Sequence, residues 1–271
     1  MLTINVAIAT LGAEGIIRVS KMLPPEKPGV KYIISWQQYD EGPQPKALLE
    51  RKDVQIYKFD GVGLSANRNN AVSKCNGDII LIADDDITYY PDFILKLRET
   101  YENDSDLDLA IFKVDFPYPK NYPDKDCRLT LPLPKNYYCS SIEISFRSKI
   151  KEYMKFYEDM GLGTGYMQCG EDELFLYSAL KKGYNCNFVS KTIAIHEDIS
   201  SGHKISKGIL RGQGFVIAAL YPGSFFIRIP LKAYRLMKEH KIKFWWAFKG
   251  LREGALRKIF NWDKITIECR W

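Results

Sequence analysis

The stretch IILIADDDITYYPDF, residues 79–93, decides how the rest of the chain is interpreted. It opens with an apolar run typical of a strand buried on both faces, and the run leads directly into Asp84, Asp85 and Asp86. Adjacent carboxylates repel one another, so a strand that fixes three of them in one place favours a site where a cation compensates their charge. The alternative is a solvated turn, because aspartate is common in turns.

Short β-rich runs alternate with helical segments around this stretch, which is the pattern of an α/β domain with a mostly parallel sheet. We predict strands at residues 4–10, 30–36, 54–59, 79–83, 107–114, 140–146, 186–189 and 192–195. We predict helices at residues 14–22, 64–74, 91–101, 148–157 and 172–182. Ligands of such sheets bind beyond the carboxyl ends of the strands, and the three aspartates follow one of these ends.

The composition is that of a globular protein, with 46% hydrophobic and 27% charged residues among 271. No apolar run approaches the roughly 20 residues of a spanning helix, and the first residues lack the features of a secretory signal. We therefore expect a cytoplasmic protein. Its six cysteines occur singly, which favours reduced thiols over a zinc site.

The chain divides into a predicted catalytic domain, residues 1–215, and a basic, aromatic extension, residues 216–271. From Arg228 onward there are twelve lysines and arginines against four acidic residues. Apolar residues recur there at helical spacing, at Phe244, Phe248, Leu251, Ala255 and Ile259. This stripe either lies on an anionic membrane, with Trp245 and Trp246 at the headgroups, or packs back on the catalytic domain. No nucleic-acid-binding module accompanies it, so nucleic acid is not an expected partner.

The three aspartates predict a magnesium or manganese site, because these ions prefer oxygen ligands and bind one or two carboxylates together with phosphate. His196 closes a β-like run and could add a nitrogen ligand, with His203 as its rival. The segment GVGLSANRNN, residues 61–70, offers glycines for close backbone approach and Arg68 for phosphate. Its alternative is an ordinary helix start.

A candidate base lies in GEDELFLYSALKKG, residues 170–183, where Glu171 and Asp172 open a predicted helix. Acidic residues at this position usually cap the helix and interact with its dipole. An acid that is fixed on a helix end can also take a proton from a hydroxyl group. Both interpretations stay open on the residues alone.

A long segment with five prolines, DFPYPKNYPDKDCRLTLPLPKNYY at residues 115–138, follows the strand at 107–114. Loops of this length in compact domains are usually functional or disordered, and five aromatic residues argue against disorder. We expect an ordered loop beside the site.

The order of these motifs resembles the family-2 glycosyltransferases of the GT-A fold. The best matching stretches are GLSANRNNAVSKCNGDIILIADDD, GEDELFLYSALKKGYN and IAIH. The resemblance implies a GT-A (Rossmann-like) mixed, mostly parallel sheet flanked by helices, with the basic helical extension after it. It also implies an inverting transfer from a nucleotide-sugar donor, with a UDP-sugar favoured, to a glycan or lipid-linked acceptor.

The resemblance also assigns roles to single residues. Asp84 and Asp86 match the ends of the Asp-x-Asp motif that binds Mn²⁺ or Mg²⁺, and Asp86 is the expected direct ligand. Asp172, next to Glu171, matches the general base. His196 matches a histidine beside the diphosphate or metal, and Arg68 matches an arginine on the nucleotide side.

Further donor contacts are expected from Thr10 and Asp85. Family members commonly carry an aspartate after the second strand, and Gln37 or Asp40 would replace it here. Two alternative functions remain, a sugar-phosphate nucleotidyltransferase and a non-catalytic module that binds nucleotide sugars or glycans. The first would be expected to show a glycine-rich, lysine-bearing N-terminus, which LGAEGIIRVSKML matches poorly.

Overall fold

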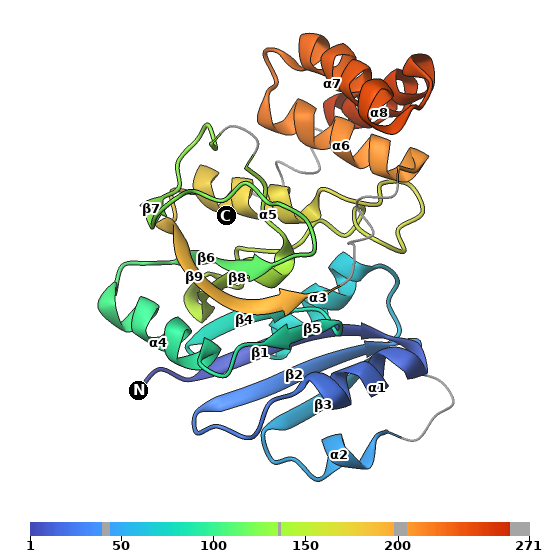
Figure 1. Cartoon of the computed structure of the whole chain (residues 1–271). Coiled ribbons are helices and arrows are strands. Elements are labelled where there is room, and N and C mark those ends of the chain that lie inside the picture. The colour runs from blue at the N-terminus through green and yellow to red at the C-terminus, as the bar shows by residue number, and fades with distance from the viewer. Residues whose placement is uncertain (40–43, 135–136, 198–204, 261–271) are drawn as a thin grey trace. The chain divides into compact units, whose positions relative to one another are not determined.

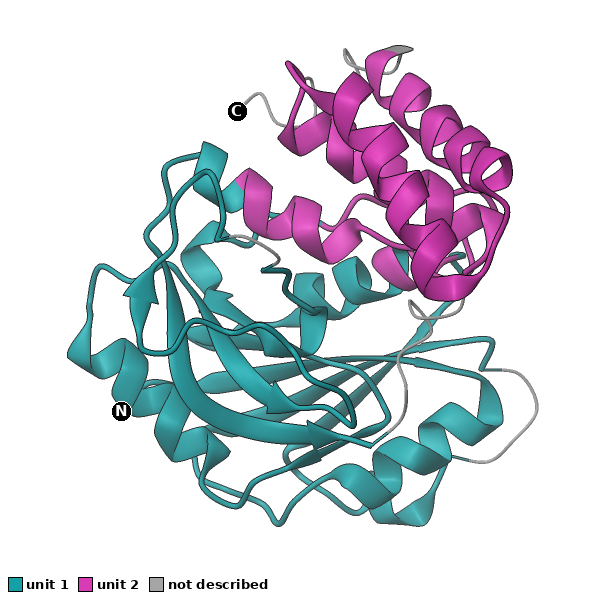
Figure 2. Cartoon of the chain, turned by 45° about the horizontal axis from the view of Figure 1, so that its top comes forward, with its two compact units in different colours: residues 1–62, 66–155, 179–199 teal, residues 63–65, 156–178, 200–271 magenta. Residues whose placement is uncertain are grey.

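The computed structural model describes residues 1–39, 44–134, 137–197 and 205–260. The chain forms two compact units, shown in different colours in Figure 2. Unit 1 contains Met1–Val62, Ala66–Lys155 and Ala179–Ile199. Unit 2 contains Gly63–Ser65, Phe156–Ser178 and Ser200–Trp271.

Unit 1 is built on one nine-stranded sheet (Figure 1). Its strands are β1 (Ile4–Leu11), β2 (Val30–Gln37), β3 (Val54–Phe59), β4 (Ile79–Ala83), β5 (Ile87–Tyr89), β6 (Leu109–Asp115), β7 (Cys127–Arg128), β8 (Ile144–Arg147) and β9 (Cys186–His196). The order is β3-β2-β1-β4-β8-β6-β9-β5, with β7 beside β9. Strands β1 to β4 are parallel, and β8 is antiparallel to both β4 and β6. Because β9 is parallel to β6, the carboxyl ends of β4, β6 and β9 lie at the same end of the sheet.

Helices of unit 1 cover both faces of the sheet. They are α1 (Gly12–Met22), α2 (Lys46–Leu49), α3 (Leu64–Lys74), whose first residues belong to unit 2, and α4 (Phe93–Asn103). Apolar residues of α1, α2 and α4 form one buried cluster with Ile4, Val6 and Ile8 of β1. On the opposite face, Asn70 of α3 donates to Ser35 Oγ of β2 at 2.7 Å. The predicted fold class, a mixed and mostly parallel sheet flanked by helices, is confirmed.

Several predicted elements have the bounds that the sequence pattern gave them, and others do not. Strands 54–59 and 79–83 and helix 64–74 are confirmed without change. The helix predicted at 148–157 is wrong, because only the short 3-10 helix Ser148–Ile150 forms. There the backbone N–H of Ser148 donates to Asp78 O, and Lys151 Nζ donates to Cys75 O at 2.8 Å. These long-range bonds hold the segment against the loop before β4 and replace a continuing helix.

Two predicted strand boundaries are also wrong. The first half of the strand predicted at 140–146 is the 3-10 helix Ser141–Glu143, because Ser140 and Glu143 form a capping box. The two strands predicted at 186–189 and 192–195 are one strand, β9. The pairing of β9 with β6 shifts register around Lys113, which absorbs the irregular residues between them.

Unit 2 contains three long helices, α6 (Lys207–Leu220), α7 (Phe225–His240) and α8 (Phe244–Phe260), and most of α5 (Glu171–Lys181). Helices α6 and α8 approach closely at glycines, since a Cβ at Gly214 would collide with Leu251 O and one at Gly254 with Arg211 O. Leu251 and Ala255 of the predicted apolar stripe are buried in this helical cluster, while Ile259 is exposed. The helical C-terminal region is therefore confirmed. The division at residue 215 stays a prediction, and it falls inside α6.

Candidate active site

The three aspartates lie in the short connection between β4 and β5, at the carboxyl end of the sheet. Their side chains do not converge on one point. Each has its own partner from a different element, so three residues that are adjacent in sequence take three different environments.

Asp84 is bound by Arg68 of α3. The Nη2 atom of Arg68 donates to both carboxylate oxygens at 2.9 Å, and Nε approaches Oδ1 at 3.3 Å. Only 3% of the Arg68 side chain is exposed, against 27% for Asp84. This paired geometry fixes Asp84 at the start of the turn while leaving part of its carboxylate accessible.

Asp85 connects the turn to β1 and α1. Thr10 Oγ1 donates to its Oδ2 at 2.5 Å, and Arg18 donates to its Oδ1 from Nε at 3.0 Å and Nη2 at 2.9 Å. A Cβ at Gly15 would come within 2.7 Å of this carboxylate, so the glycine makes the contact with α1 feasible. Burial raises the pKa of Asp85, against the opposing effect of the Thr10 and Arg18 hydrogen bonds.

Asp86 faces His196. Strand β5 pairs with β9 so that Ile87 lies opposite His196, which brings the imidazole beside the preceding residue, Asp86. The two atoms Nε2 of His196 and Oδ2 of Asp86 are 3.4 Å apart. Burial alone would raise the pKa of Asp86, but the hydrogen bond and charge of His196 act against it together with weaker contributions, and the pKa is lowered. The ring of Phe116 lies 5.7 Å from that of His196.

These residues fit a divalent ion that is held partly by the protein. Among residues 1–39, 44–134, 137–197 and 205–260, no three histidine, cysteine or acidic side chains gather into a complete metal cage. Mg²⁺ and Mn²⁺ at phosphates need only one or two protein ligands. Asp86, with 36% of its side chain exposed, and His196 supply one oxygen and one nitrogen next to each other.

Other predicted donor contacts lie at the same end of the sheet. The side-chain amide of Gln37, at the end of β2, donates to Gly61 O, which holds the segment before α3. Asn67 Nδ2 donates to Thr10 O at 3.0 Å. Asp40 and His203 lie outside the described residues. Unit 1 thus brings together Thr10, Arg68, the three aspartates and His196.

Glu171 and Asp172 belong to unit 2, in the first turn of α5. Glu171 is buried, and Asp172 is partly exposed. A Cβ on Gly161, which has a φ of +98°, would lie 3.2 Å from the Glu171 carboxyl. Ser65 Oγ donates to Met160 O at 2.6 Å in the same unit, which ties the start of α3 to this glycine-rich segment. The geometry presents a carboxylate at a helix N-terminus, where the dipole favours its charged form.

Sequence reasoning missed two groups around the site. Arg18 balances Asp85 although 67 residues separate them, and no local pattern in the sequence points to that pairing. Lys120 of the proline-rich loop forms an ion pair with Glu143 at 2.6 Å, and both side chains are sealed from solvent. The described part of the loop lies beside the site, because the ring of Phe116 is 5.7 Å from that of His196.

Comparisons with known proteins bear on the family and on the fold. The model described as Glycosyl transferase family 2 matches residues 39–170. S. aureus TarS 1-349 in complex with UDP is similar at 15% identity and a TM-score of 0.57, over 89% of this chain and 73% of that one. TarS 1-349 alone gives 14% identity and a TM-score of 0.59, over 95% and 92%. TarS 1-349 in complex with UDP-GlcNAc gives 15% and 0.56, over 98% and 76%.

At this identity the solved structures establish a common fold and nothing finer. The comparison with curated proteins gave no match. The family model begins after the end of β2 and stops at the residue before α5, and it includes the aspartate turn. Residues 39–170 therefore match glycosyl transferase family 2, within a fold that the chain shares with the TarS structures.

Proposed function

We propose that the chain transfers a sugar from a UDP-sugar to a hydroxyl group of a glycan or lipid-linked acceptor, with inversion at the anomeric carbon. The observation that carries this proposal is the pair of Asp86 and His196 at the carboxyl end of the sheet, in a chain that matches this family over residues 39–170. The TarS structures with UDP and UDP-GlcNAc support a UDP-sugar as the donor.

On the donor side, Asp86 and His196 would hold Mn²⁺ or Mg²⁺, which when bound neutralises the charge of the diphosphate leaving group. Asp84 is held in place by Arg68 and accepts donor hydroxyl groups through its exposed part. Thr10 and Asp85 keep the turn in position, and Gln37 holds Gly61 on the side proposed for the nucleoside.

On the acceptor side, Asp172 takes the proton of the attacking hydroxyl group. The hydroxyl oxygen forms a bond to the anomeric carbon while the bond from that carbon to the diphosphate oxygen breaks, and UDP leaves. A single displacement of this kind inverts the configuration. Glu171 precedes Asp172 in the sequence and is buried. Its carboxylate adds negative charge at the N-terminus of α5.

A panel of nucleotide sugars with Mn²⁺, assayed for slow hydrolysis and for transfer, tests the proposal. We expect a UDP-sugar to be consumed, and Asp172→Asn to lower the rate by about 10²- to 10⁴-fold with UDP binding unchanged. Asp86→Asn should instead weaken UDP binding in the presence of Mn²⁺, measured by calorimetry. Glu173→Gln, in the same helical turn, is the matched control and should keep its rate.

Three outcomes would contradict the proposal. Consumption of NTP and sugar phosphate, with no nucleotide sugar hydrolysed, would indicate a nucleotidyltransferase. Binding of nucleotide sugars without turnover would indicate a non-catalytic module. A near-normal rate for Asp172→Asn would remove the base assignment.

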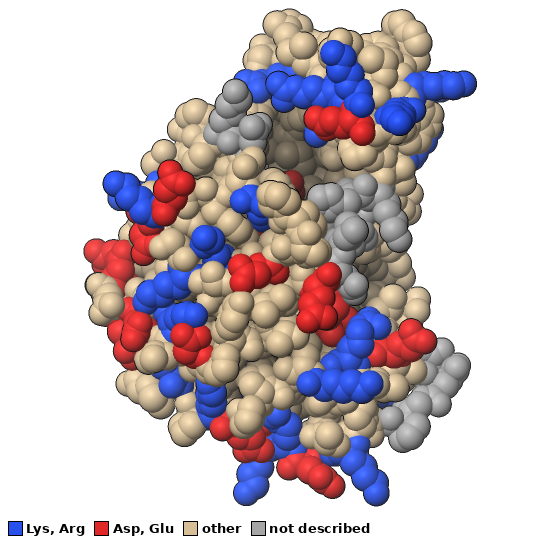
Figure 3. All heavy atoms as spheres, in the orientation of Figure 1, with Lys and Arg blue, Asp and Glu red and all other residues tan. Residues whose placement is uncertain are grey.

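The proposal includes contact with an anionic membrane at its cytoplasmic face. Large apolar residues are exposed on α7 (Phe226, Ile227, Leu231 and Tyr234), and Trp245 of α8 is 74% exposed. Lysine and arginine predominate among the charged side chains over α6–α8 in Figure 3. No helix in the described part of the chain is long and apolar enough to cross a membrane. Exposed aromatic and basic residues together suit peripheral binding at lipid headgroups.

Flotation of the full chain with vesicles containing phosphatidylglycerol tests this contact. We expect the wild-type chain to float and Leu231→Ser with Trp245→Ser to lose most of that binding. Leu95→Ser, at an exposed leucine of α4 in unit 1, is the control. Equal flotation of all three proteins, or none by the wild type, would contradict the contact.

A further inference from the structure

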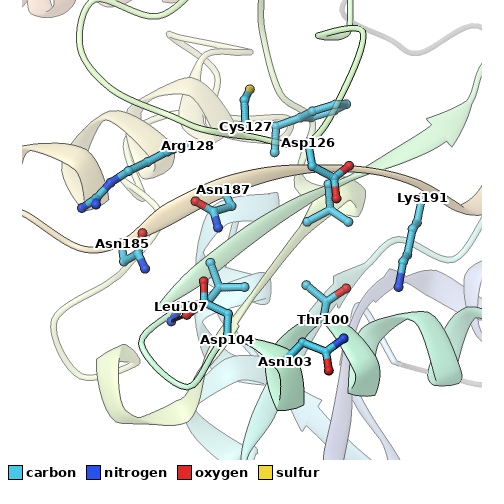
Figure 4. A pocket seen from close by; sticks show the side chains of 12 residues that line it. Thr100, Asn103, Asp104, Leu107, Asp126, Cys127, Arg128, Asn185, Asn187 and Lys191 are labelled. Atoms are coloured by element: carbon cyan, nitrogen blue, oxygen red, sulfur yellow. Dashed lines mark hydrogen bonds between the residues drawn. The ribbon is translucent and has the colours of Figure 1, made fainter.

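A pocket lies in unit 1 at the opposite end of the sheet from the aspartate turn. It has a volume of about 510 Å³ and lies between α4, the segment that precedes β6, β7 and the start of β9 (Figure 4). Asn185 and Asn187 flank Cys186, the first residue of β9, and Leu107 precedes β6. Because β4, β6 and β9 run in the same direction, the amino ends of β6 and β9 are remote from the carboxyl end of β4. The volume is typical of small-molecule sites.

The carboxamides of this pocket have unused hydrogen-bonding capacity. The Oδ1 atom of Asn187 is buried and has no hydrogen-bond partner among the residues that the structure describes. In the described part of the chain, the side chains of Asn103 and Asn185 also make no hydrogen bond with the protein. A buried polar atom without a partner destabilises the fold, so its presence beside a pocket indicates a ligand that completes the bonding.

Most charged groups of the pocket are engaged, but the side chain of Arg128, which also lines it, makes no hydrogen bond or ion pair with the described residues. Asp126 accepts hydrogen bonds from the backbone N–H of Ser190 at 2.7 Å and from its hydroxyl group. Lys191 Nζ lies 2.9 Å from Glu99 Oε2. Asp104 Oδ1 accepts from the backbone N–H of Leu107 at 3.0 Å. What stays free for recognition in this lining is therefore the Arg128 guanidinium and a set of neutral carboxamides.

The backbone holds these amides in place. The backbone N–H of Asn185 donates to Asp108 Oδ2 at 2.9 Å, and its carbonyl accepts from the backbone of Asp108 and Leu109. In Figure 4 the side chain of Asn187 extends from β9 toward the side of α4 that carries Thr100 and Asn103. Polar groups that helices and strands hold in place lose little conformational entropy when a ligand binds.

A neutral ligand with many hydroxyl groups fits this chemistry best. A carboxamide has two N–H donors and a carbonyl acceptor. A sugar hydroxyl group can therefore accept a hydrogen bond from it or donate one to it. Phe188, Val189 and Leu107 line the pocket with buried apolar surface for the C–H faces of a sugar ring. An inorganic anion would meet Arg128, but it would also meet the carboxylates of Asp104 and Asp126, and Lys191 is already paired with Glu99. A neutral ligand avoids this repulsion and can still accept a hydrogen bond from Arg128.

We propose that this pocket binds a saccharide unit, independently of the nucleotide-sugar site. Its biological use rests on the proposed function, because an enzyme that extends a glycan gains from holding a more distant unit of the same chain. A glycan that is held in this pocket has its end at a raised effective concentration near the transfer site. This gain needs no new contact at the reacting atoms.

The test is binding of the labelled full-length chain to an array of neutral and anionic oligosaccharides. Calorimetry with the best-bound oligosaccharide then measures its dissociation constant. We expect Asn187→Ala and Asn103→Ala each to weaken binding by about 3- to 10-fold, the effect of losing neutral hydrogen bonds. Asn121→Ala removes an exposed asparagine outside the pocket and is the matched control. Equal melting temperatures of the three variants would show that they remain folded.

A competition experiment distinguishes this pocket from the nucleotide site. UDP with Mn²⁺ should not displace the oligosaccharide, and Asp172→Asn, whether or not it abolishes transfer, should leave the binding unchanged. The proposal is overturned if the array shows no binding, if UDP displaces the oligosaccharide, if the pocket variants bind like Asn121→Ala, or if inorganic phosphate alone competes.

Discussion

Two groups of charges in unit 1 are built from similar side chains but differ in their access to water. Lys120 and Glu143 form an ion pair whose side chains are 2% and 0% exposed. In the aspartate turn, Asp84 keeps 27% and Asp86 keeps 36% of the side chain exposed. A charge that is sealed together with all its partners can serve only the fold, whereas a paired charge that stays accessible can also meet a ligand.

The sealed pair anchors the proline-rich loop. Glu143 accepts hydrogen bonds from Lys120, from the Tyr122 hydroxyl group and from the backbone N–H of Ser140. The ammonium group of Lys120 also lies 4.5 Å from the ring of Tyr138 and 4.9 Å from that of Phe116. Since Phe116 contacts His196, the buried pair holds in place the aromatic ring next to the candidate metal ligand.

The largest effect is expected from breaking this pair on one side. Lys120→Met leaves Glu143 buried without its cation, and we expect a loss of about 3–5 kcal/mol in the free energy of unfolding. Urea denaturation at pH 7 measures it. Lys120→Met combined with Glu143→Gln removes both charges and should recover part of the loss. A single variant that loses less than about 1 kcal/mol would show that the pair is not a structural anchor.

The effect of Lys120→Met should depend on pH. Burial raises the pKa of Glu143 even in the wild type, although Lys120 opposes the shift. An acid whose pKa is raised in the folded chain destabilises the fold fully above that pKa. This destabilisation disappears below the usual pKa of a glutamate, where the acid is protonated in both the folded and the unfolded chain. The difference in stability between wild type and variant should therefore shrink as the pH falls through this window. A difference that is constant with pH would argue against an ionised Glu143.

A much smaller effect is expected at Asp85, the most buried carboxylate of the turn. Its pKa is raised because burial outweighs the hydrogen bonds from Thr10 and Arg18, so the ionised form destabilises the fold as pH rises through that pKa. Asp85→Asn removes this cost, and Arg18, which is 48% exposed, can be hydrated instead. We expect the free energy of unfolding at pH 7 to be unchanged or higher by less than about 1 kcal/mol.

Thermal denaturation at pH 7 and at pH 3 checks the Asp85 prediction. The difference between wild type and Asp85→Asn should vanish at the lower pH, where Asp85 is protonated in both the folded and the unfolded chain. A loss of more than about 2 kcal/mol at pH 7 would mean that the ionised carboxylate stabilises the turn, and the contrast with Glu143 would then fail.

The sequence predicted the site less completely than the fold. The strand at 79–83, the helix at 64–74 and the position of the aspartates follow from apolar runs and from their ends, which are local patterns. The helix predicted at 148–157 was wrong because the backbone carbonyls of Asp78 and Cys75 accept hydrogen bonds from Ser148 N–H and Lys151 Nζ, which hold that segment from a distance. Propensity is a weak guide wherever such long-range bonds compete with the local ones.

The sequence by itself determined the α/β architecture, the family resemblance and the presence of an acidic turn at a strand end. Only the tertiary structure decided that Asp84 faces Arg68, Asp85 faces Thr10 and Arg18, and Asp86 faces His196. It also decided that part of the α8 stripe is buried within unit 2 and that three carboxamides line a pocket at the far end of the sheet. The physical reason is that the apolar pattern that predicts a strand depends only on residues adjacent in the chain. The partner of a side chain depends on strand order and register.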